Sequence, residues 1–323
     1  MKRQIAICSM MHFLVDGLCI CCLYLLVAPD AIGGWVGLFM GYNVLAFVTQ
    51  PLTGWMADRA RHPHWMLLTA MALLTLAVMT AVGMGLARQT PTWGMWTVAA
   101  LLGLGNSFFH VWGGKQTAVV TDNDVSALGM FVSTGAFGLA VGGVFCSWTL
   151  LGVFLAAICL LAIAYLQLET ATQDDGKRPV DVFSTVNPED HFPLPRHMVW
   201  IGIGAVMAFV AGRSLISGLF AADIGKSTSL ILATGLVAML GKMAGGWIAK
   251  GAGMLKTFFA LVAAVSACLL FAEGNQTLAF MGLFLINCTM PITLWIANEM
   301  MNGKEGLAFG LLAAPLVVVF LFF

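Results

Sequence analysis

Ionisable and amide side chains stand inside several of the long apolar stretches of this 323-residue sequence. A charged side chain at the centre of a membrane costs about 2.5–3.5 kcal/mol on insertion scales, so each one needs a partner, water or a function. Seven such residues are candidates for binding a small solute or carrying protons: His12, Asp16, Asn106, His110, Arg213, Lys242 and Asn287.

His12 and Asp16 are four residues apart, a spacing that places both side chains on one face of a helix. A carboxyl group whose access to water changes can take up and release a proton, and a neighbouring imidazole can share that proton. We therefore expect this pair to exchange protons. The alternative is a structural pair, in which Asp16 binds a buried base or hydroxyl and locks two helices together.

Asn106 and His110 have the same spacing in a later apolar stretch. Imidazole titrates close to neutral pH, so His110 could bind a substrate or relay a proton. A histidine that only hydrogen-bonds two helices together is the alternative. Asn287 lies in a stretch with Pro291, and a proline inside a membrane helix leaves backbone carbonyls free. That helix could bend as a gate, or carry a kink that serves packing alone.

Arg213 and Lys242 are too deep in their apolar stretches to reach water easily, so both need anions. If Asp16 pairs with one, the other is left to attract an anionic substrate. Arginine suits a phosphonate or a carboxylate because its fork binds two oxygens at once. Lys242 stands only eight residues before Lys250, which favours a place nearer the membrane surface and a role in gating or packing.

The elements that carry these residues are apolar segments long enough to span a bilayer, about 20 residues each. Hydrophobic residues make up 60% of the chain and charged residues only 9%, which excludes a soluble fold. The sequence predicts an all-α polytopic membrane protein with eleven spans, near residues 5–28, 32–53, 65–87, 93–115, 126–148, 150–168, 198–221, 228–250, 255–273, 277–298 and 306–323.

A polar, proline-containing segment divides these spans into two sets. We predict a six-helix N-terminal half over residues 1–168, a cytoplasmic linker over 169–197 and a five-helix C-terminal half over 198–323. The halves look duplicated, because PLTGWMADRA (51–60) and MAGGWIAKGA (243–252) close the second and eighth spans at an offset of 192 residues. In this alignment Gly54 matches Gly246, and Trp55 matches Trp247.

Basic residues indicate the orientation, because cytoplasmic loops retain Lys and Arg. With the N-terminus inside, the outer loops hold only Arg88 and Lys226. The inner loops and helix ends hold eleven basic residues: Lys2, Arg3, Arg59, Arg61, Lys115, Lys177, Arg178, Arg196, Lys250, Lys256 and Lys304. We expect a cytoplasmic N-terminus and a place in the cell (inner or plasma) membrane.

The loop after the second span resembles that of the major facilitator superfamily, whose signature is G-x-x-x-D-[RK]-x-G-[RK]. Gly54, Asp58 and Arg59 match this motif, whereas Arg61 takes the place of its second glycine. The resemblance implies that the acid and the base tie helix ends together on the cytoplasmic side. It also implies a cavity lined by helices 1, 4, 7 and 10, which favours Arg213 as a cavity residue, and it implies a monomer.

The fourth span, GLGNSFFHVWGGKQTA (103–118), is similar to helix 4 of fosmidomycin-resistance-type transporters, although that subfamily often has proline where Val111 stands. The resemblance implies secondary transport by alternating access, with proton-coupled efflux of a small compound or drug, anionic compounds included. An uptake permease for a small organic anion is the alternative. The superfamily has twelve helices and eleven are counted here, which leaves open a truncated remnant that does not transport.

Other classes of function find little support. An intramembrane enzyme is disfavoured, because no HExxH or G-x-S-x-G motif and no catalytic pair of carboxylates occurs in a span. The formal net charge is zero, which disfavours nucleic acid as a partner. The eight cysteines lie in apolar runs without metal-ligand spacing to histidine. We therefore expect no cofactor and no metal, with protons, a small solute and the lipid bilayer as partners.

Overall fold

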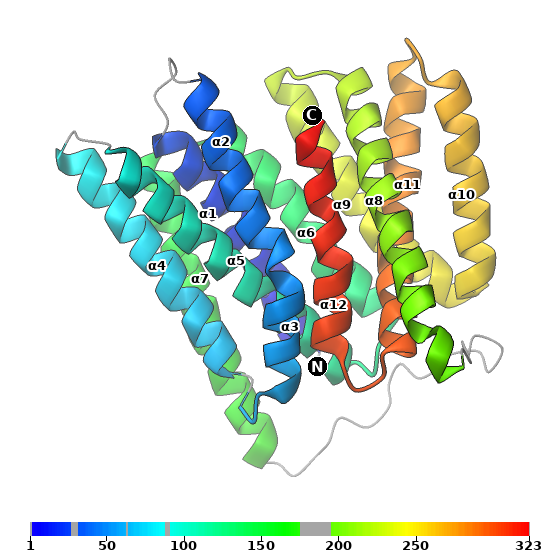
Figure 1. Cartoon of the computed structure of the whole chain (residues 1–323), viewed down its shortest axis with the longest axis horizontal. Helices are drawn as coiled ribbons and strands as arrows, with labels where there is room; N and C mark the ends of the chain where they lie inside the picture. Colours follow the sequence, from blue (N-terminus) through cyan, green and yellow to red (C-terminus); the bar gives the residue numbers. More distant parts are fainter. Residues whose placement is uncertain (1, 27–31, 63, 88–90, 175–194, 323) are drawn as a thin grey trace.

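The first set of helices contains six rods in the computed structural model, which describes residues 2–26, 32–62, 64–87, 91–174 and 195–322 (Figure 1). The second rod is one helix interrupted by a π-helical turn at η1, and it therefore carries three labels. The elements are α1 (Lys2–Leu26), α2 (Ile32–Asn43), η1 (Val44–Val48), α3 (Gln50–Arg59), α4 (His64–Ala87), α5 (Thr92–Val120), α6 (Val125–Val144) and α7 (Trp148–Asp174).

The second set contains five rods in the described part of the chain, the last of which tightens from α-helix to 3₁₀-helix. A short 3₁₀ turn, η3, precedes them. The elements are η3 (Arg196–Met198), α8 (Val199–Ile224), α9 (Thr228–Ala252), α10 (Met254–Phe271), α11 (Gln276–Met300), α12 (Glu305–Ala313) and η4 (Ala314–Leu321). Eight of these helices are long and apolar enough to cross a membrane. The predicted all-α polytopic fold with about eleven spans is confirmed.

Several helices extend beyond their predicted ends, among them the fourth and the sixth spans. The fourth span, α5, continues to Val120, and the sixth, α7, continues to Asp174, six residues into the segment predicted as a linker. The extension of α7 contains neither glycine nor proline, and both residue types follow only at Gly176 and Pro179. Most of the predicted linker, residues 175–194, lies outside the described residues.

Small residues let the helices approach closely. Along the contact between α1 and α6, a Cβ added to Gly138 would lie 2.1 Å from the carbonyl oxygen of Phe13. A Cβ added to Gly142 would lie 2.2 Å from the carbonyl oxygen of Gly17. The glycines of α6 therefore hold α1 in place, and α1 carries His12 and Asp16.

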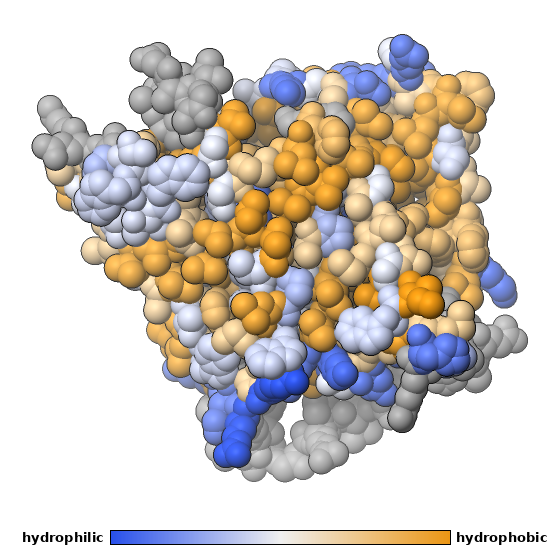
Figure 2. All heavy atoms as spheres, viewed as in Figure 1, coloured by the Kyte–Doolittle hydropathy of each residue, from blue (hydrophilic) through white to orange (hydrophobic). Residues whose placement is uncertain are grey.

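A belt of apolar side chains covers the middle of the molecule, with polar residues gathered toward both ends of the bundle (Figure 2). Large apolar side chains are exposed on several helices, among them Leu160 of α7, and Phe259 and Leu270 of α10. Such a surface matches the hydrocarbon core of a bilayer, and the chain is a multi-pass membrane protein.

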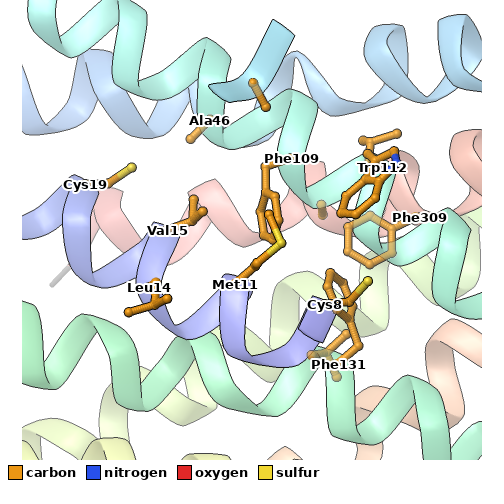
Figure 3. Close-up of a cluster of buried hydrophobic side chains, with 14 of the residues drawn as sticks. Cys8, Met11, Leu14, Val15, Cys19, Ala46, Phe109, Trp112, Phe131 and Phe309 are labelled. Atoms are coloured by element: carbon orange, nitrogen blue, oxygen red, sulfur yellow. The ribbon is translucent and has the colours of Figure 1, made fainter. Parts of the chain in front are cut away.

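Buried aromatic and sulfur-containing side chains fill the interior where α1, α5, α6 and α12 meet (Figure 3). Met11, Phe109, Phe131 and Phe309 belong to this cluster. The His12 ring lies 4.8 Å from the Phe131 ring, and the His110 ring lies 5.7 Å from the Phe109 ring, measured between ring centroids. The polar residues of α1 and α5 are therefore surrounded by apolar packing, which raises the energetic cost of any unpaired charge there.

Candidate functional site

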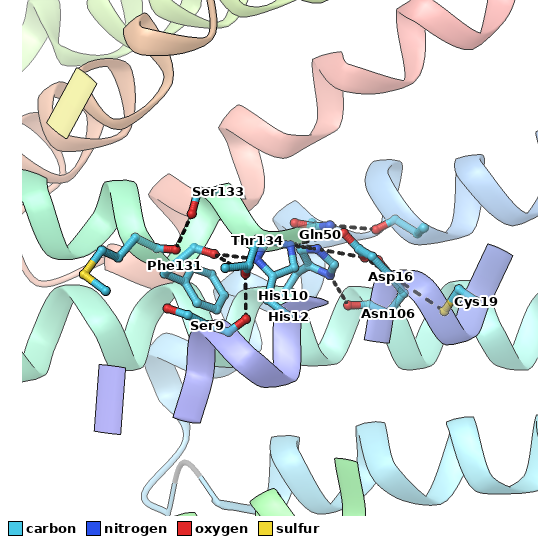
Figure 4. Close-up of polar contacts among 12 residues, drawn as sticks. Ser9, His12, Asp16, Cys19, Gln50, Asn106, His110, Phe131, Ser133 and Thr134 are labelled. Atoms are coloured by element: carbon cyan, nitrogen blue, oxygen red, sulfur yellow. Dashed lines mark hydrogen bonds and ion pairs between the residues drawn. The ribbon is translucent and has the colours of Figure 1, made fainter. Parts of the chain in front are cut away.

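His12, Asp16 and His110 meet inside the bundle, and all three side chains are buried. His12 Nε2 lies 3.2 Å from Asp16 Oδ2, and His110 Nε2 lies 3.4 Å from Asp16 Oδ1. The two Nε2 atoms are 2.8 Å apart, within hydrogen-bonding distance. Two predicted pairs, one on α1 and one on α5, thus form a single cluster (Figure 4).

The remaining ring nitrogens of this cluster define its protonation. His12 Nδ1 lies 2.7 Å from the carbonyl oxygen of Phe131, and His110 Nδ1 lies 3.0 Å from that of Asn106. Carbonyl oxygens only accept hydrogen bonds, so both Nδ1 atoms carry hydrogen. In neutral rings the two Nε2 atoms would then oppose each other with lone pairs, beside a carboxylate. A single proton between them removes that repulsion, and it balances the charge of Asp16.

Two further residues shape the cluster. Asn106 donates a hydrogen bond through Nδ2 to Asp16 Oδ1 at 3.0 Å, while its own Oδ1 is buried without a hydrogen-bond partner in the described part of the chain. A Cβ added to Gly135 of α6 would lie 2.2 Å from Asp16 Oδ2 and 2.4 Å from His12 Nε2. Only glycine leaves room for the cluster at this position. Nothing in the sequence shows what faces Gly135, so its role at the cluster becomes visible only in the structure.

Arg213 and Lys242, on α8 and α9, form no ion pair or hydrogen bond with any residue that the structure describes. Arg213 is 5% exposed, and its Nε is buried without an acceptor. Lys242 is partly buried and lies within electrostatic range of both Arg213 and Asp16. The expected pairing of Asp16 with one of these cations is therefore not seen. Asp16 contacts the two histidines instead, and neither Arg213 nor Lys242 contacts an acidic residue in the described part of the chain.

Asn287 stands apart from the cluster. Its Nδ2 donates to the carbonyl oxygen of Leu283 at 2.9 Å and to Ser217 Oγ at 3.4 Å, which connects α11 to α8. It also faces Gly241 of α9, where an added Cβ would lie 3.1 Å from the Asn287 Cβ. Asn287 therefore lies where α8, α9 and α11 meet.

The motif residues at the end of α3 contact the start of α12. Asp58 accepts hydrogen bonds from the backbone amides of Gly306 at 2.9 Å and Leu307 at 2.8 Å. A carboxylate at a helix N-terminus is stabilised by the helix dipole. A Cβ added to Gly54 would lie 2.2 Å from the carbonyl oxygen of Gly306, so the two helices touch through their backbones.

The cation that pairs with Asp58 is not the neighbouring arginine. Lys115 of α5 lies 3.1 Å from Asp58 and also donates to the carbonyl oxygen of Ala57 at 2.8 Å. The Arg59 guanidinium instead lies 4.0 Å from the centroid of the Trp55 ring, and the Arg59 and Arg61 side chains are exposed. The resemblance implied that Asp58 and Arg59 both tie helix ends together. Asp58 contacts α12, whereas the Arg59 side chain lies over Trp55 of its own helix, because consecutive helical residues point in different directions.

The repeated segment at the end of α9 makes the corresponding contact with α6. A Cβ added to Gly246 would lie 2.6 Å from the carbonyl oxygen of Val125, so Gly246 approaches α6 as Gly54 approaches α12. Lys250, which aligns with Asp58 in the repeat, forms an ion pair with Asp124, the N-cap of α6. This pair could not be predicted from the repeat, because the aligned residues carry opposite charges. Asp58 binds the first backbone amides of α12, whereas Lys250 binds Asp124, the residue that caps the start of α6.

A third contact lies at the same end of the bundle. Asn123 donates through Nδ2 to Glu299 Oε1 at 2.7 Å, and Asn298 donates to Asn123 Oδ1 at 2.8 Å. Asn123 lies between α5 and α6, and its partners lie at the end of α11. The two sets of helices are thus connected at three points near the chain's N-terminus.

Comparisons with known proteins agree with this architecture. A family model described as the Major Facilitator Superfamily matches residues 6–316. A sequence search of curated proteins finds no match. Among solved structures, the chain is similar to a variant of the E. coli fucose:proton symporter FucP, with a TM-score of 0.65 and 12% sequence identity over 97% of this chain and 88% of that one. At this level of identity the similarity concerns the fold.

Proposed function

Because this chain belongs to the major facilitator superfamily, a family of secondary transporters, we propose that it moves a small anionic solute across a membrane by alternating access, coupled to protons. Transport rather than enzymatic chemistry follows from the family. We propose in addition that the substrate is an anion bound by Arg213 and Lys242, and that protons are coupled through His12, Asp16 and His110. FucP, to which the chain is similar in fold, is a fucose:proton symporter.

The observation that carries the proton coupling is the pair of opposed Nε2 atoms of His12 and His110, 2.8 Å apart beside Asp16. With both Nδ1 atoms protonated, the cluster is stable with one additional proton and strained without it. Two additional protons would place two N–H groups against each other at that distance. The cluster therefore suits a site that loads and releases a single proton as its access to water changes sides.

An anionic substrate is supported by Arg213 and Lys242, which have no anionic partner among the residues that the structure describes. Burying an uncompensated charge costs several kcal/mol, and a protein retains such a charge where a ligand supplies the counter-ion. The Arg213 fork suits a carboxylate or phosphonate, and the Lys242 ammonium adds a point charge nearby. Because Lys242 also lies within electrostatic range of Asp16, protonation of the cluster and binding of an anion can influence each other.

The contacts at the N-terminal end of the bundle support a gate on that side. We propose that Asp58, Lys250 and their partners hold this end closed, with the backbone contacts of Gly54 and Gly246 as the surfaces that separate when the protein opens there. We propose that this end lies in the cytoplasm, which the basic residues in the predicted inner loops support, and that the protein works as a monomer in the inner or plasma membrane.

The experiment is proton movement in liposomes that contain the purified protein, with a panel of small carboxylates and phosphonates under an imposed pH gradient. An anion that drives proton movement supports the proposal and identifies its chemical class. The direction in which proton and anion move relative to each other distinguishes efflux by exchange, which we propose, from uptake by symport. A folded protein that binds panel anions without moving protons would contradict proton coupling.

A further inference from the structure

The donor atoms of the His12, Asp16 and His110 cluster are arranged as metal ligands usually are. Each histidine donates Nδ1–H to a main-chain carbonyl and turns Nε2 inward, which is the outer hydrogen bond that orients most metal-binding histidines. Asn106 holds Asp16 through Oδ1, and Oδ2 lies 3.2 Å from His12 Nε2. The ligand-type atoms of the three residues all lie within 4.8 Å of one another.

The spacing of these atoms fits one ion. Donor atoms that each lie about 2.1 Å from a single tetrahedral Zn²⁺ stand about 3.4 Å from each other. The separations are 2.8 Å between the two Nε2 atoms, 3.2 Å from His12 Nε2 to Asp16 Oδ2 and 3.4 Å from His110 Nε2 to Asp16 Oδ1, so an entering ion needs the two rings to move slightly apart. Two imidazoles with one carboxylate suit divalent transition metals such as Zn²⁺, Co²⁺ and Ni²⁺, whereas Mg²⁺ and Ca²⁺ favour oxygen ligands.

We propose that His12, Asp16 and His110 form a three-ligand site for a divalent transition metal ion, which binds in place of the proton that the two histidines share. The inference concerns the same side chains as the proposed proton site, and it predicts that bound metal blocks proton coupling. Three protein ligands leave at least one coordination position for water or for an anionic ligand. The site could not be predicted from sequence spacing, because the third ligand comes from α5, 98 residues from His12.

The groups around the cluster determine how strongly pH affects metal binding. Cys19 of α1, Tyr42 of α2 and Lys242 of α9 lie within electrostatic range of Asp16, and α6 contributes the Phe131 carbonyl, the Phe131 ring and Gly135. The Lys242 ammonium opposes a second positive charge, so an anion bound at Lys242 should strengthen metal binding. Since the metal takes the place of the shared proton, binding should release a proton.

The test is Zn²⁺ binding to the purified full chain in detergent, measured by calorimetry and by competition with a chelator. We expect one ion per chain, proton release on binding, and a loss of affinity of roughly 100-fold in His12→Gln and in His110→Gln. The control is the double variant His62→Gln/His64→Gln, which removes two histidines close together in sequence at the start of α4 and should bind Zn²⁺ like the wild type. Thermal unfolding shows whether each variant is folded.

A second measurement does not depend on the variants. Co²⁺ bound to the wild-type protein should give the intense visible spectrum of a four- or five-coordinate site with nitrogen and oxygen ligands. A weak octahedral spectrum, binding that survives in His12→Gln/His110→Gln, or binding lost in the His62/His64 control would each overturn the inference. Proton-coupled transport without Zn²⁺ binding would reject the metal site and leave the proposed function standing. Zn²⁺ binding without proton-coupled transport would support the metal site and contradict the proposed function.

Discussion

His12 and His110 lie 98 residues apart in the sequence, and their Nε2 atoms lie 2.8 Å apart in the structure. Each ring donates its other nitrogen to a main-chain carbonyl, so the rings cannot relieve their contact by changing tautomer. The contact needs a cation, and Asp16 supplies the balancing charge within 3.4 Å of both rings. A proton is the simplest cation that can do this and leave again.

Gly135→Ala tests whether the cluster depends on the space that α6 leaves for it. The new methyl group would lie 2.2 Å from Asp16 Oδ2, so Asp16 or His12 must move. We expect proton-coupled transport to fall at least about tenfold, with a stability loss of about 1–3 kcal/mol from overpacking. Transport in liposomes and thermal unfolding measure the two effects.

The matched control is Gly152→Ala on α7, where an added Cβ meets nothing within 4 Å. It should leave transport unchanged and stabilise the helix slightly, because alanine is a better helix former than glycine. Equal transport by Gly135→Ala and the wild type would show that the geometry of the cluster is not required.

Arg213→Gln tests the anion site. Removing a buried, unpaired guanidinium should not destabilise the fold, and it should weaken binding of the anion, raising its KM about tenfold or more. Arg213→Lys keeps the charge but loses the fork, so its KM should lie between those of Arg213→Gln and the wild type. An unchanged KM in Arg213→Gln, measured with the anion found in the liposome panel, would remove Arg213 from the site.

Lys250 and Asp124 test the proposed gate. Asp124→Asn removes the charge, and asparagine remains a good N-cap for α6. Because Lys250 is partly exposed, we expect the pair to stabilise the closed end by only about 0.5–1 kcal/mol. Asp124→Asn and Lys250→Ala should therefore each raise the ratio of open to closed protein at that end two- to fivefold. Spin-label distances between α3 and α12 measure this ratio.

A double variant separates the pair from its surroundings. If the two side chains act on each other, Lys250→Ala/Asp124→Asn should open the end no more than either single change. The control, Lys256→Ala, changes an exposed lysine six residues further on and should have no effect. Fully additive single effects would show that Lys250 and Asp124 act independently.

The sequence predicted the spans and the residues of the cluster, but not their grouping. Apolar length is a local property, and the spacing of His12 and Asp16 places them on one face without any knowledge of the fold. That His110 joins them depends on how α5 packs against α1. The same limit applies to Asp58, whose partners Lys115, Gly306 and Leu307 are brought to it by two other helices.

The repeat shows a second limit of sequence reasoning. Identical glycines at positions 54 and 246 were recognised, and in the structure both bring backbones together. Asp58 and Lys250 occupy equivalent positions but carry opposite charges, so identity could not reveal that each one secures the start of a facing helix. Equivalent function here depends on what lies across the contact.

The most direct test of the account is proton movement in Asp16→Asn, measured beside exchange of the same anion across liposomes without a pH gradient. Asparagine keeps the size of the side chain and removes the charge that balances the shared proton. We predict that anion-driven proton movement is lost while anion exchange and binding remain measurable. Proton movement equal to that of the wild type would contradict the assignment of the His12, Asp16 and His110 cluster as the coupling site.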